Sequence, residues 1–172
     1  MAFDADKIQK ELAEGKGPVL EWVARDHGVP ALDVFRLLPK DQRLIVEHPP
    51  MAHVLATLTG WGEVMIIAQS DSLVAEIVSA IPPATLGRGY FNFHGDTPFG
   101  GHLKEGACTH IAFVERPFAG RRSLSIVFFD QNGGSIFKVF VRRAADGELL
   151  PDQEAAFIAF RAEMFARDAA AS

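Results

Sequence analysis

The sequence predicts an α+β fold, in which N-terminal helices and one C-terminal helix pack on an antiparallel β-sheet. Helical spacing of apolar residues dominates the first third of the chain, whereas aromatic and β-branched runs dominate after Thr85. The chain has 172 residues, of which 48% are hydrophobic and 23% are charged, and these values are typical of one globular domain. We therefore expect a single domain over residues 1–172, with an ordered core over about 4–167.

Three short helices are expected first. Their segments are 5–14, 18–28 and 30–38. The first places Ile8 and Leu12 four residues apart, on one face. Pro18 is a favourable start for the second helix, and Gly28 is a favourable end.

The second and third helices together resemble a DNA-binding helix-turn-helix. After the turn, however, Asp33 and Arg36 are the only charged residues, so a basic recognition face is lacking. We therefore favour a packing role for these helices, with a DNA-binding regulator as the alternative.

The middle of the chain is expected to mix strands and helices. The segments are a strand over 44–47, a helix over 51–59 and a strand over 63–69. Asp71 or Ser72 is a suitable N-cap for a further helix, which would end at Ile81 before Pro82 and Pro83.

Four strands are expected in the second half of the chain. Their segments are 90–93, 109–115, 123–130 and 135–142. The last two form a hairpin, because Asn132 and Gly133 tolerate the positive φ of a tight turn. A final helix follows Pro151. Its apolar residues at helical spacing are Phe157, Phe160, Met164 and Phe165.

The strand segments 124–129 and 136–141 are apolar at nearly every position, so both faces of the sheet must be covered. Helices can cover one face. The other is covered either by further helices of the same chain or by a ligand or second subunit, and we expect a homodimer.

Charge and composition argue against several functions. The net charge is −5 and the basic residues are scattered, whereas nucleic-acid binding requires concentrated positive charge. Cys108 is the only cysteine, so neither an intrachain disulfide nor a thiolate zinc cluster is expected, and burial is its simplest role. The N-terminus lacks a secretory pattern, and no apolar run reaches the roughly 20 residues of a membrane span. We expect a cytoplasmic protein with no nucleic-acid partner and no membrane insertion.

The segment Gly87–His102 is the candidate functional site. It holds the only tyrosine, Tyr90, followed by a glycine-rich turn expected over Gly95–His102. Strand alternation predicts two faces. One carries Tyr90, Asn92 and His94, and the other carries Phe91 and Phe93. The glycines would let a flat ligand approach the backbone closely.

Tyr90 is the candidate iron ligand. A phenolate is a hard anionic ligand that suits ferric iron, and tyrosine is one of the few side chains that bind haem iron. His94 competes for this role, but four residues of strand span ~13 Å, so both side chains cannot readily bind opposite faces of one iron. His94 or His102 is better assigned as a hydrogen-bond partner or an alternative ligand.

The run YFNFHGDTPFGGHLKEG, followed by RPFAGRRSLSIVFFDQNGGSIFKVFVRR, closely resembles the HutX/ChuX family of haem utilisation carriers. The resemblance is strongest from Arg88 to Arg161 and weaker in the N-terminal helices. It implies an α+β homodimer that binds haem in the bacterial cytosol and passes it to haem-degrading enzymes.

The resemblance also implies roles for individual residues. Tyr90 matches the family's axial ligand to ferric haem b, and Phe91 matches its pocket neighbour. His94, His102 and, less directly, His53 are the histidines to consider as further contacts. Arg88, Lys104 and Arg116 are the nearest cations for the haem propionates.

A haem-degrading enzyme is the alternative, because larger relatives of this fold make it conceivable. The sequence has no flavin or nicotinamide motif, and Asp96 has no second carboxylate or positioned base in its motif. Asp96 is therefore expected to form a turn. We expect a carrier without catalytic residues.

Overall fold

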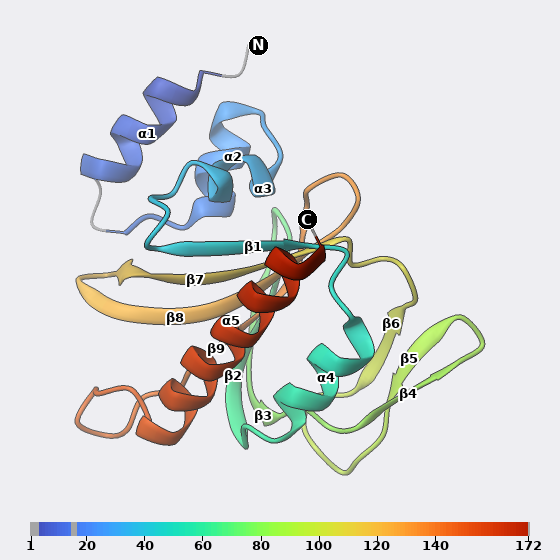
Figure 1. Cartoon of the computed structure of the whole chain (residues 1–172). Helices are drawn as coiled ribbons and strands as arrows, with labels where there is room; N and C mark the ends of the chain where they lie inside the picture. Colours follow the sequence, from blue (N-terminus) through green and yellow to red (C-terminus); the bar gives the residue numbers. More distant parts are fainter. Residues whose placement is uncertain (1–3, 15–16, 172) are drawn as a thin grey trace.

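The structure is a computed structural model that describes residues 4–14 and 17–171 (Figure 1). The helices of these residues are α1 (Ala5–Glu14), α2 (Leu20–His27), α3 (Ala31–Arg36), α4 (Met51–Thr59) and α5 (Pro151–Ala171). The strands are β1 (Arg43–Glu47), β2 (Glu63–Gln69), β3 (Val74–Ala80), β4 (Ala84–Gly87), β5 (Tyr90–Phe93), β6 (Gly101–Lys104), β7 (His110–Phe118), β8 (Arg121–Phe129) and β9 (Ser135–Phe140). None of these helices is both long and apolar enough to cross a membrane.

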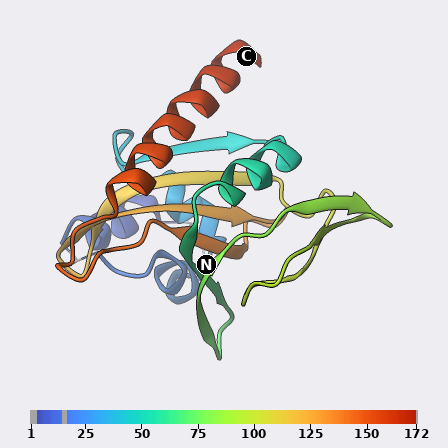
Figure 2. The ribbon, with the colours of Figure 1, turned by 90° about the horizontal axis from the view of Figure 1, so that it is seen from below.

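Six strands form the large sheet, in the order β1-β7-β8-β9-β2-β3, and every neighbouring pair is antiparallel. Figure 2 shows α4 and α5 on one side of this sheet and α1, α2 and α3 on the other. Alternation along β7 sends Ile111 and Phe113 into the core under α5, and Ala112 and Val114 into the core under the N-terminal helices. The predicted α+β architecture is confirmed.

The N-terminal helices act as a cover for the sheet. Gly28, at φ 66°, ends α2 as its position predicts. Four of the six residues of α3 are buried, namely Ala31, Leu32, Val34 and Phe35. The ring of Phe35 stands edge-on to Phe129 of β8 at 5.0 Å. Asp33 and Arg36, which stay outside, pair with each other at 3.2 Å. The apolar residues of the stretch that resembles a helix-turn-helix therefore pack against the large sheet.

On the opposite side of the sheet, α5 supplies the main core. Phe157, Phe160 and Met164 are buried as their spacing predicts. Both phenylalanine rings stand edge-on to Phe113 of β7, at 5.6 and 5.3 Å. Phe165 does not belong to this stripe and is 62% exposed, because one residue beyond Met164 is a rotation of about 100° around the helix.

The helix expected between Asp71 and Ile81 is wrong. This segment is β3, which pairs with β2 from Glu63↔Ala80 to Gln69↔Val74. Ser70, Asp71 and Ser72 form the hairpin turn between β2 and β3, where Ser70 N donates to Leu73 O at 2.8 Å. Turn-forming residues and helix N-caps are the same residue types, so the local sequence did not distinguish them.

The connection between β8 and β9 is the predicted hairpin. Asp130 Oδ1 accepts hydrogen bonds from the backbone N–H groups of Asn132 and Gly134, at 2.8 and 2.9 Å. Gly133 adopts φ 76°, whereas Asn132 does not need a positive φ. Glycine and aspartate therefore set this turn, with Asn132 as a backbone donor.

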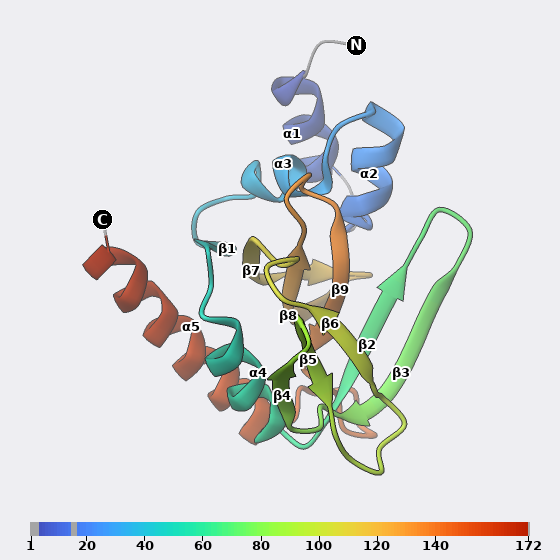
Figure 3. The ribbon, with the colours of Figure 1, turned by 90° about the vertical axis from the view of Figure 1, so that its right-hand side faces the viewer.

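Three strands form a second, small sheet in the order β4-β5-β6, which stands beside α4 (Figure 3). β5 has the predicted bounds. β4 and β6 were not predicted from the sequence. The expected turn Gly95–His102 is shorter than predicted, because its last two residues begin β6. Backbone pairing with β5 makes Gly101–Lys104 a strand despite its glycine-rich start.

Candidate functional site

Tyr90 lies at the tip of the small sheet. The β4–β5 hairpin turns through Arg88 and Gly89, at φ 54° and 78°, which is the pair of positive φ angles that a two-residue hairpin requires. Tyr90 is the first residue of β5, directly after this turn, and is 42% exposed. A tight turn thus holds the backbone at Tyr90 while the side chain stays accessible.

Two rows of residues cross the face of the small sheet that carries Tyr90. Residues directly opposite in antiparallel strands point to the same side. The first row is Gly87, Tyr90 and Lys104, and the second is Thr85, Asn92 and His102. Gly87 has no side chain, so no side chain stands opposite Tyr90 on β4, whereas Lys104 supplies a cation opposite it on β6.

Hydrogen bonds connect the second row. Asn92 Nδ2 faces three backbone carbonyls, of Thr85, Gly87 and Tyr90, at 3.2, 3.1 and 3.0 Å. Asn92 Oδ1 lies 2.7 Å from His102 Nδ1. The ring of His102 stands edge-on to that of Tyr90, with centroids 6.3 Å apart. The row therefore supports the immediate surroundings of Tyr90.

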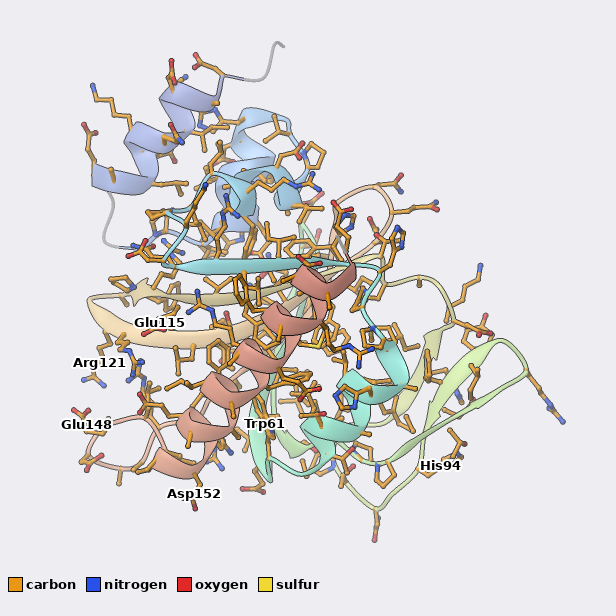
Figure 4. The ribbon with its side chains drawn as sticks, in the orientation of Figure 1. Trp61, His94, Glu115, Arg121, Glu148 and Asp152 are labelled. Atoms are coloured by element: carbon orange, nitrogen blue, oxygen red, sulfur yellow. The ribbon has the colours of Figure 1, made fainter. Side chains whose placement is uncertain are left out.

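His94 joins this face from the end of β5. Its Nε2 lies 2.6 Å from Thr85 Oγ1, and its backbone N–H donates to Pro83 O at 2.7 Å. The structure thus brings Tyr90, His94 and His102 to one face, with Asn92 and Thr85 between the two histidines. Figure 4 shows His94 on the small sheet, on the opposite side of the molecule from Arg121 and Glu148.

Phe91 points the other way from Tyr90. It is only 7% exposed and belongs to the main core with Leu103. Further along, the rings of Phe93 and Phe99 lie 5.2 Å apart. Phe91 thus anchors the strand that carries Tyr90 to the core.

Three other candidates fall in different places. Arg88 lies in the hairpin turn next to Tyr90. His53 of α4 pairs with Glu163 of α5 at 2.6 Å. Arg116 of β7 belongs to the large sheet, where Nη1 donates to Pro18 O at 2.8 Å. The structure therefore groups Arg88 and Lys104 with Tyr90, and it does not bring Arg116 into that group.

Sequence reasoning passed over Asn92 as a functional candidate. Strand alternation already placed it on the face of Tyr90, which was the available signal. Its partner His102 was expected in a loop, and the cross-strand contact depends on β6, so it could not be foreseen without that strand.

A second accessible region lies on the large sheet, where the N-terminal helices leave part of the face uncovered. A cavity of about 750 Å³ opens there. We call its apolar floor and walls the open sheet face. Its residues are Trp22, Met65, Ile67, Val74, Val78, Phe118 and Phe140. Trp22, Phe118 and Val78 are 47%, 44% and 38% exposed.

Charged groups are buried within the open sheet face. Lys138 Nζ lies 3.0 Å from Glu21 Oε1 and donates to Gln69 Oε1 at 3.0 Å. Burial lowers the pKa of the Arg116 guanidinium, and the carboxylate of Glu21 partly opposes this shift. Because Lys138 and Glu21 are paired and largely buried, the accessible surface of the open sheet face is mainly apolar.

The fold places the protein among the haem-utilisation proteins. ChuX has the same architecture, with a TM-score of 0.83 and 33% identity over 91% of this chain and 97% of ChuX. A protein from Erwinia carotovora superposes with a TM-score of 0.86 and 34% identity, over 91% of this chain and 98% of that one. The Escherichia coli haem-degrading enzyme ChuS shares the fold at 16% identity and a TM-score of 0.73, over 92% of this chain and 48% of ChuS.

The sequence specifies the family more closely. The haem utilisation ChuX/HutX family matches residues 44–160. The intracellular heme transport protein HutX of Vibrio cholerae is 32% identical over 140 residues, which cover 81% of this chain and 72% of HutX. The chain belongs to the haem utilisation ChuX/HutX family, and the resemblance found in its sequence is confirmed.

Proposed function

We propose that this protein is a cytoplasmic haem carrier, which binds ferric haem b through Tyr90 and passes it to haem-degrading or haem-using proteins during iron acquisition. The observation that carries the proposal is the exposed phenol of Tyr90, directly opposite Gly87 of β4 and Lys104 of β6 and two residues after Arg88 of the hairpin turn. A phenolate suits ferric iron, and cations suit propionates.

The relatives support this proposal. HutX is named an intracellular heme transport protein, and ChuX is named a heme binding protein. The groups around Tyr90 are suited to binding, and the small-sheet face has no pair of catalytic carboxylates among its described residues. We therefore assign reversible binding and transfer, without turnover of the haem.

A second copy of the chain is proposed to cover the open sheet face. An accessible apolar surface of this kind marks an interaction site, and a two-fold dimer buries the same patch on both subunits. The homodimer predicted from the sequence is thus retained, and its interface is proposed to lie on the open sheet face, away from Tyr90.

The ligand assignment is tested by titrating the purified protein with hemin and recording the Soret band. We expect Tyr90→Phe to lose the tyrosinate spectrum and to bind hemin at least about tenfold more weakly, which corresponds to about 1.4 kcal/mol. His53→Gln is the control, because His53 pairs with Glu163 away from this face. Unchanged spectrum and affinity in Tyr90→Phe would remove Tyr90 as the ligand.

The carrier role is tested by incubating the haem-loaded protein with an electron donor, oxygen and catalase. We expect no enzymatic tetrapyrrole product, and the Soret band should persist. Release of a linear tetrapyrrole in the presence of catalase would assign the protein to the haem-degrading enzymes instead.

A further inference from the structure

A further cavity, which we call the α1 cavity, lies against the N-terminal helix. Residues of α1, of the segment that leads from α3 into β1, and of β7 line it. Its volume is about 580 Å³, which is within the range of about 300–1,000 Å³ for small-molecule sites. None of its described lining residues belongs to the small sheet, so this cavity is separate from the face that carries Tyr90.

The α1 cavity is basic. Its described lining includes several cationic side chains and no carboxylate. The cations are Arg36, Lys40, Arg43 and Arg116. Arg36 already pairs with Asp33 and Glu47, at 3.2 and 3.5 Å. The other three concentrate positive charge at one place in a chain whose net charge is −5.

Arg43 and Arg116 are neighbours on the large sheet. Arg43 of β1 lies opposite Val114 of β7, and Arg116 is two residues further along β7, so both arginines point to the same face. Val114 belongs to the core under the N-terminal helices, so this is the face that those helices cover. Diagonal neighbours of this kind are about 7–8 Å apart. Two like charges at this separation repel each other where water is partly excluded.

Backbone carbonyls use only part of each guanidinium group. Arg43 Nε donates to Leu38 O at 3.0 Å, and Arg116 Nη1 donates to Pro18 O at 2.8 Å. A guanidinium has five N–H donors, and a carbonyl carries no net charge. These bonds therefore leave both the positive charges and further donors for an anion. Burial lowers the pKa of Arg116, partly opposed by Glu21, and a bound anion would offset this cost.

A close backbone contact fixes one wall of the α1 cavity. Gly17, at φ 78°, passes so near to β7 that an added Cβ would overlap Pro117 O. Both residues line the cavity. Ile8 of α1 is completely buried in the core under the helices. The helix and the chain that follows it are thus held against the sheet, and the cavity is pre-formed.

We propose that the α1 cavity binds a diphosphate group, either as free pyrophosphate or as part of a nucleoside diphosphate. Arginine binds phosphate oxygens in a bidentate manner, so Arg43 and Arg116 can each bind one of two linked phosphates. A carboxylate carries a single charge, whereas a phosphate monoester carries about −1.5 to −2 at pH 7, so phosphates balance several cations better. Leu12, Leu37 and Pro39 offer apolar lining to an attached group.

The first experiment is isothermal titration calorimetry of the full-length, haem-free protein, at an ionic strength of about 0.15 M, where exposed charges are screened beyond about 8 Å. The ligands are pyrophosphate, inorganic phosphate and adenosine diphosphate. We expect pyrophosphate to bind at least about tenfold more tightly than inorganic phosphate. Tighter binding of adenosine diphosphate than of pyrophosphate assigns a nucleotide, and equal or weaker binding assigns free pyrophosphate.

Two results of this titration would overturn the proposal. One is the absence of saturable binding by both pyrophosphate and adenosine diphosphate. The other is inorganic phosphate that binds as tightly as pyrophosphate, because a site for two linked phosphates must distinguish them.

Variants that remove a charge test the location. Arg43→Gln should weaken pyrophosphate binding about tenfold, because charge-assisted hydrogen bonds are lost. Lys40→Gln should weaken it about threefold, and it covers the case in which Arg43→Gln disturbs the fold, because Lys40 is exposed. Arg121→Gln is the matched control, since it removes the same charge from an exposed arginine outside the cavity. Equal affinities in all three variants would refute the site.

This inference is independent of the proposed haem site. Tyr90 lies on the small sheet, whereas the α1 cavity lies under the N-terminal helix. Tyr90→Phe should therefore bind pyrophosphate as the wild type does, whatever its effect on hemin. Loss of pyrophosphate binding in folded Tyr90→Phe would place the anion on the small sheet and refute the α1 cavity as its site.

Discussion

The exposed side chains of the small sheet differ from those of the open sheet face in how they are held. Around Tyr90, short polar contacts fix an asparagine and two histidines, and the residue opposite Tyr90 on β4 is a glycine. On the open sheet face, exposed aromatic and aliphatic groups surround charges that are already paired. Oriented polar groups suit a ligand that forms directional bonds, whereas a broad apolar surface suits another protein surface.

The largest expected effect is a loss of stability when the contact between the small sheet and the core is removed. Phe91→Ala removes the buried ring behind Tyr90, and a buried Phe→Ala change costs about 3–5 kcal/mol. We expect this loss in the free energy of unfolding, measured by urea denaturation. Leu86→Ala is the control, because Leu86 lies directly opposite Phe91 but is 54% exposed. Equal destabilisation by the two changes would show that Phe91 is not the anchor.

The next effect concerns the charges within the open sheet face. Lys138→Ala leaves the buried carboxylate of Glu21 without its partner, which costs about 3 kcal/mol of unfolding free energy. The double change Lys138→Met with Glu21→Leu removes both charges and should restore most of the stability. A double variant that is less stable than Lys138→Ala would contradict this account.

A smaller effect tests the open sheet face as a subunit interface. Val78→Lys places a charge on this face and should shift the protein from dimer to monomer, which light scattering coupled to gel filtration detects. Phe165→Lys is the control, because Phe165 is 62% exposed on the outer side of α5. Dissociation by Phe165→Lys, with Val78→Lys still dimeric, would place the interface on α5.

The smallest effect probes the junction between the two sheets, where Cys108 lies between β6 and β7. Burial raises the pKa of its thiol to about 12 from 9.0, because the thiolate is poorly solvated there. The unfolded chain loses this proton first, so the stabilisation is complete below pH 9 and declines as the pH rises towards 12. Iodoacetamide at pH 8 should label Cys108 only in unfolded protein, with the extent of labelling measured by mass spectrometry. Rapid labelling of the native protein would contradict the burial of this thiol.

Patterns within one element were predictable from the sequence. β2 and β5 have their predicted bounds, and the core positions of α5 follow from helical spacing, because both patterns depend on residues near in sequence. The place of Tyr90 at the start of its strand was predictable for the same reason. Its assignment as the iron ligand rests instead on the chemistry of the phenol and on the family resemblance, and it stays a prediction.

Features that depend on pairing between distant segments were not predictable. β3 looks locally like a capped helix and becomes a strand because β2 pairs along its whole length. His102 looks like a loop residue until β6 pairs with β5, and only then does it meet Asn92. The separation of Arg116 from Tyr90 likewise depends on which sheet each strand joins.

Gly87 has a consequence for how this chain tolerates mutation. It does not adopt a left-handed conformation, and an added Cβ would meet only Asn92 Nδ2, at the ordinary distance of 3.6 Å. The backbone therefore makes no demand for glycine here. Selection for folded protein alone should therefore accept alanine at this position, and hemin titration of Gly87→Ala would measure whether the proposed ligand needs the surface that glycine leaves open. Position 87 can thus test the proposed ligand with little change in stability.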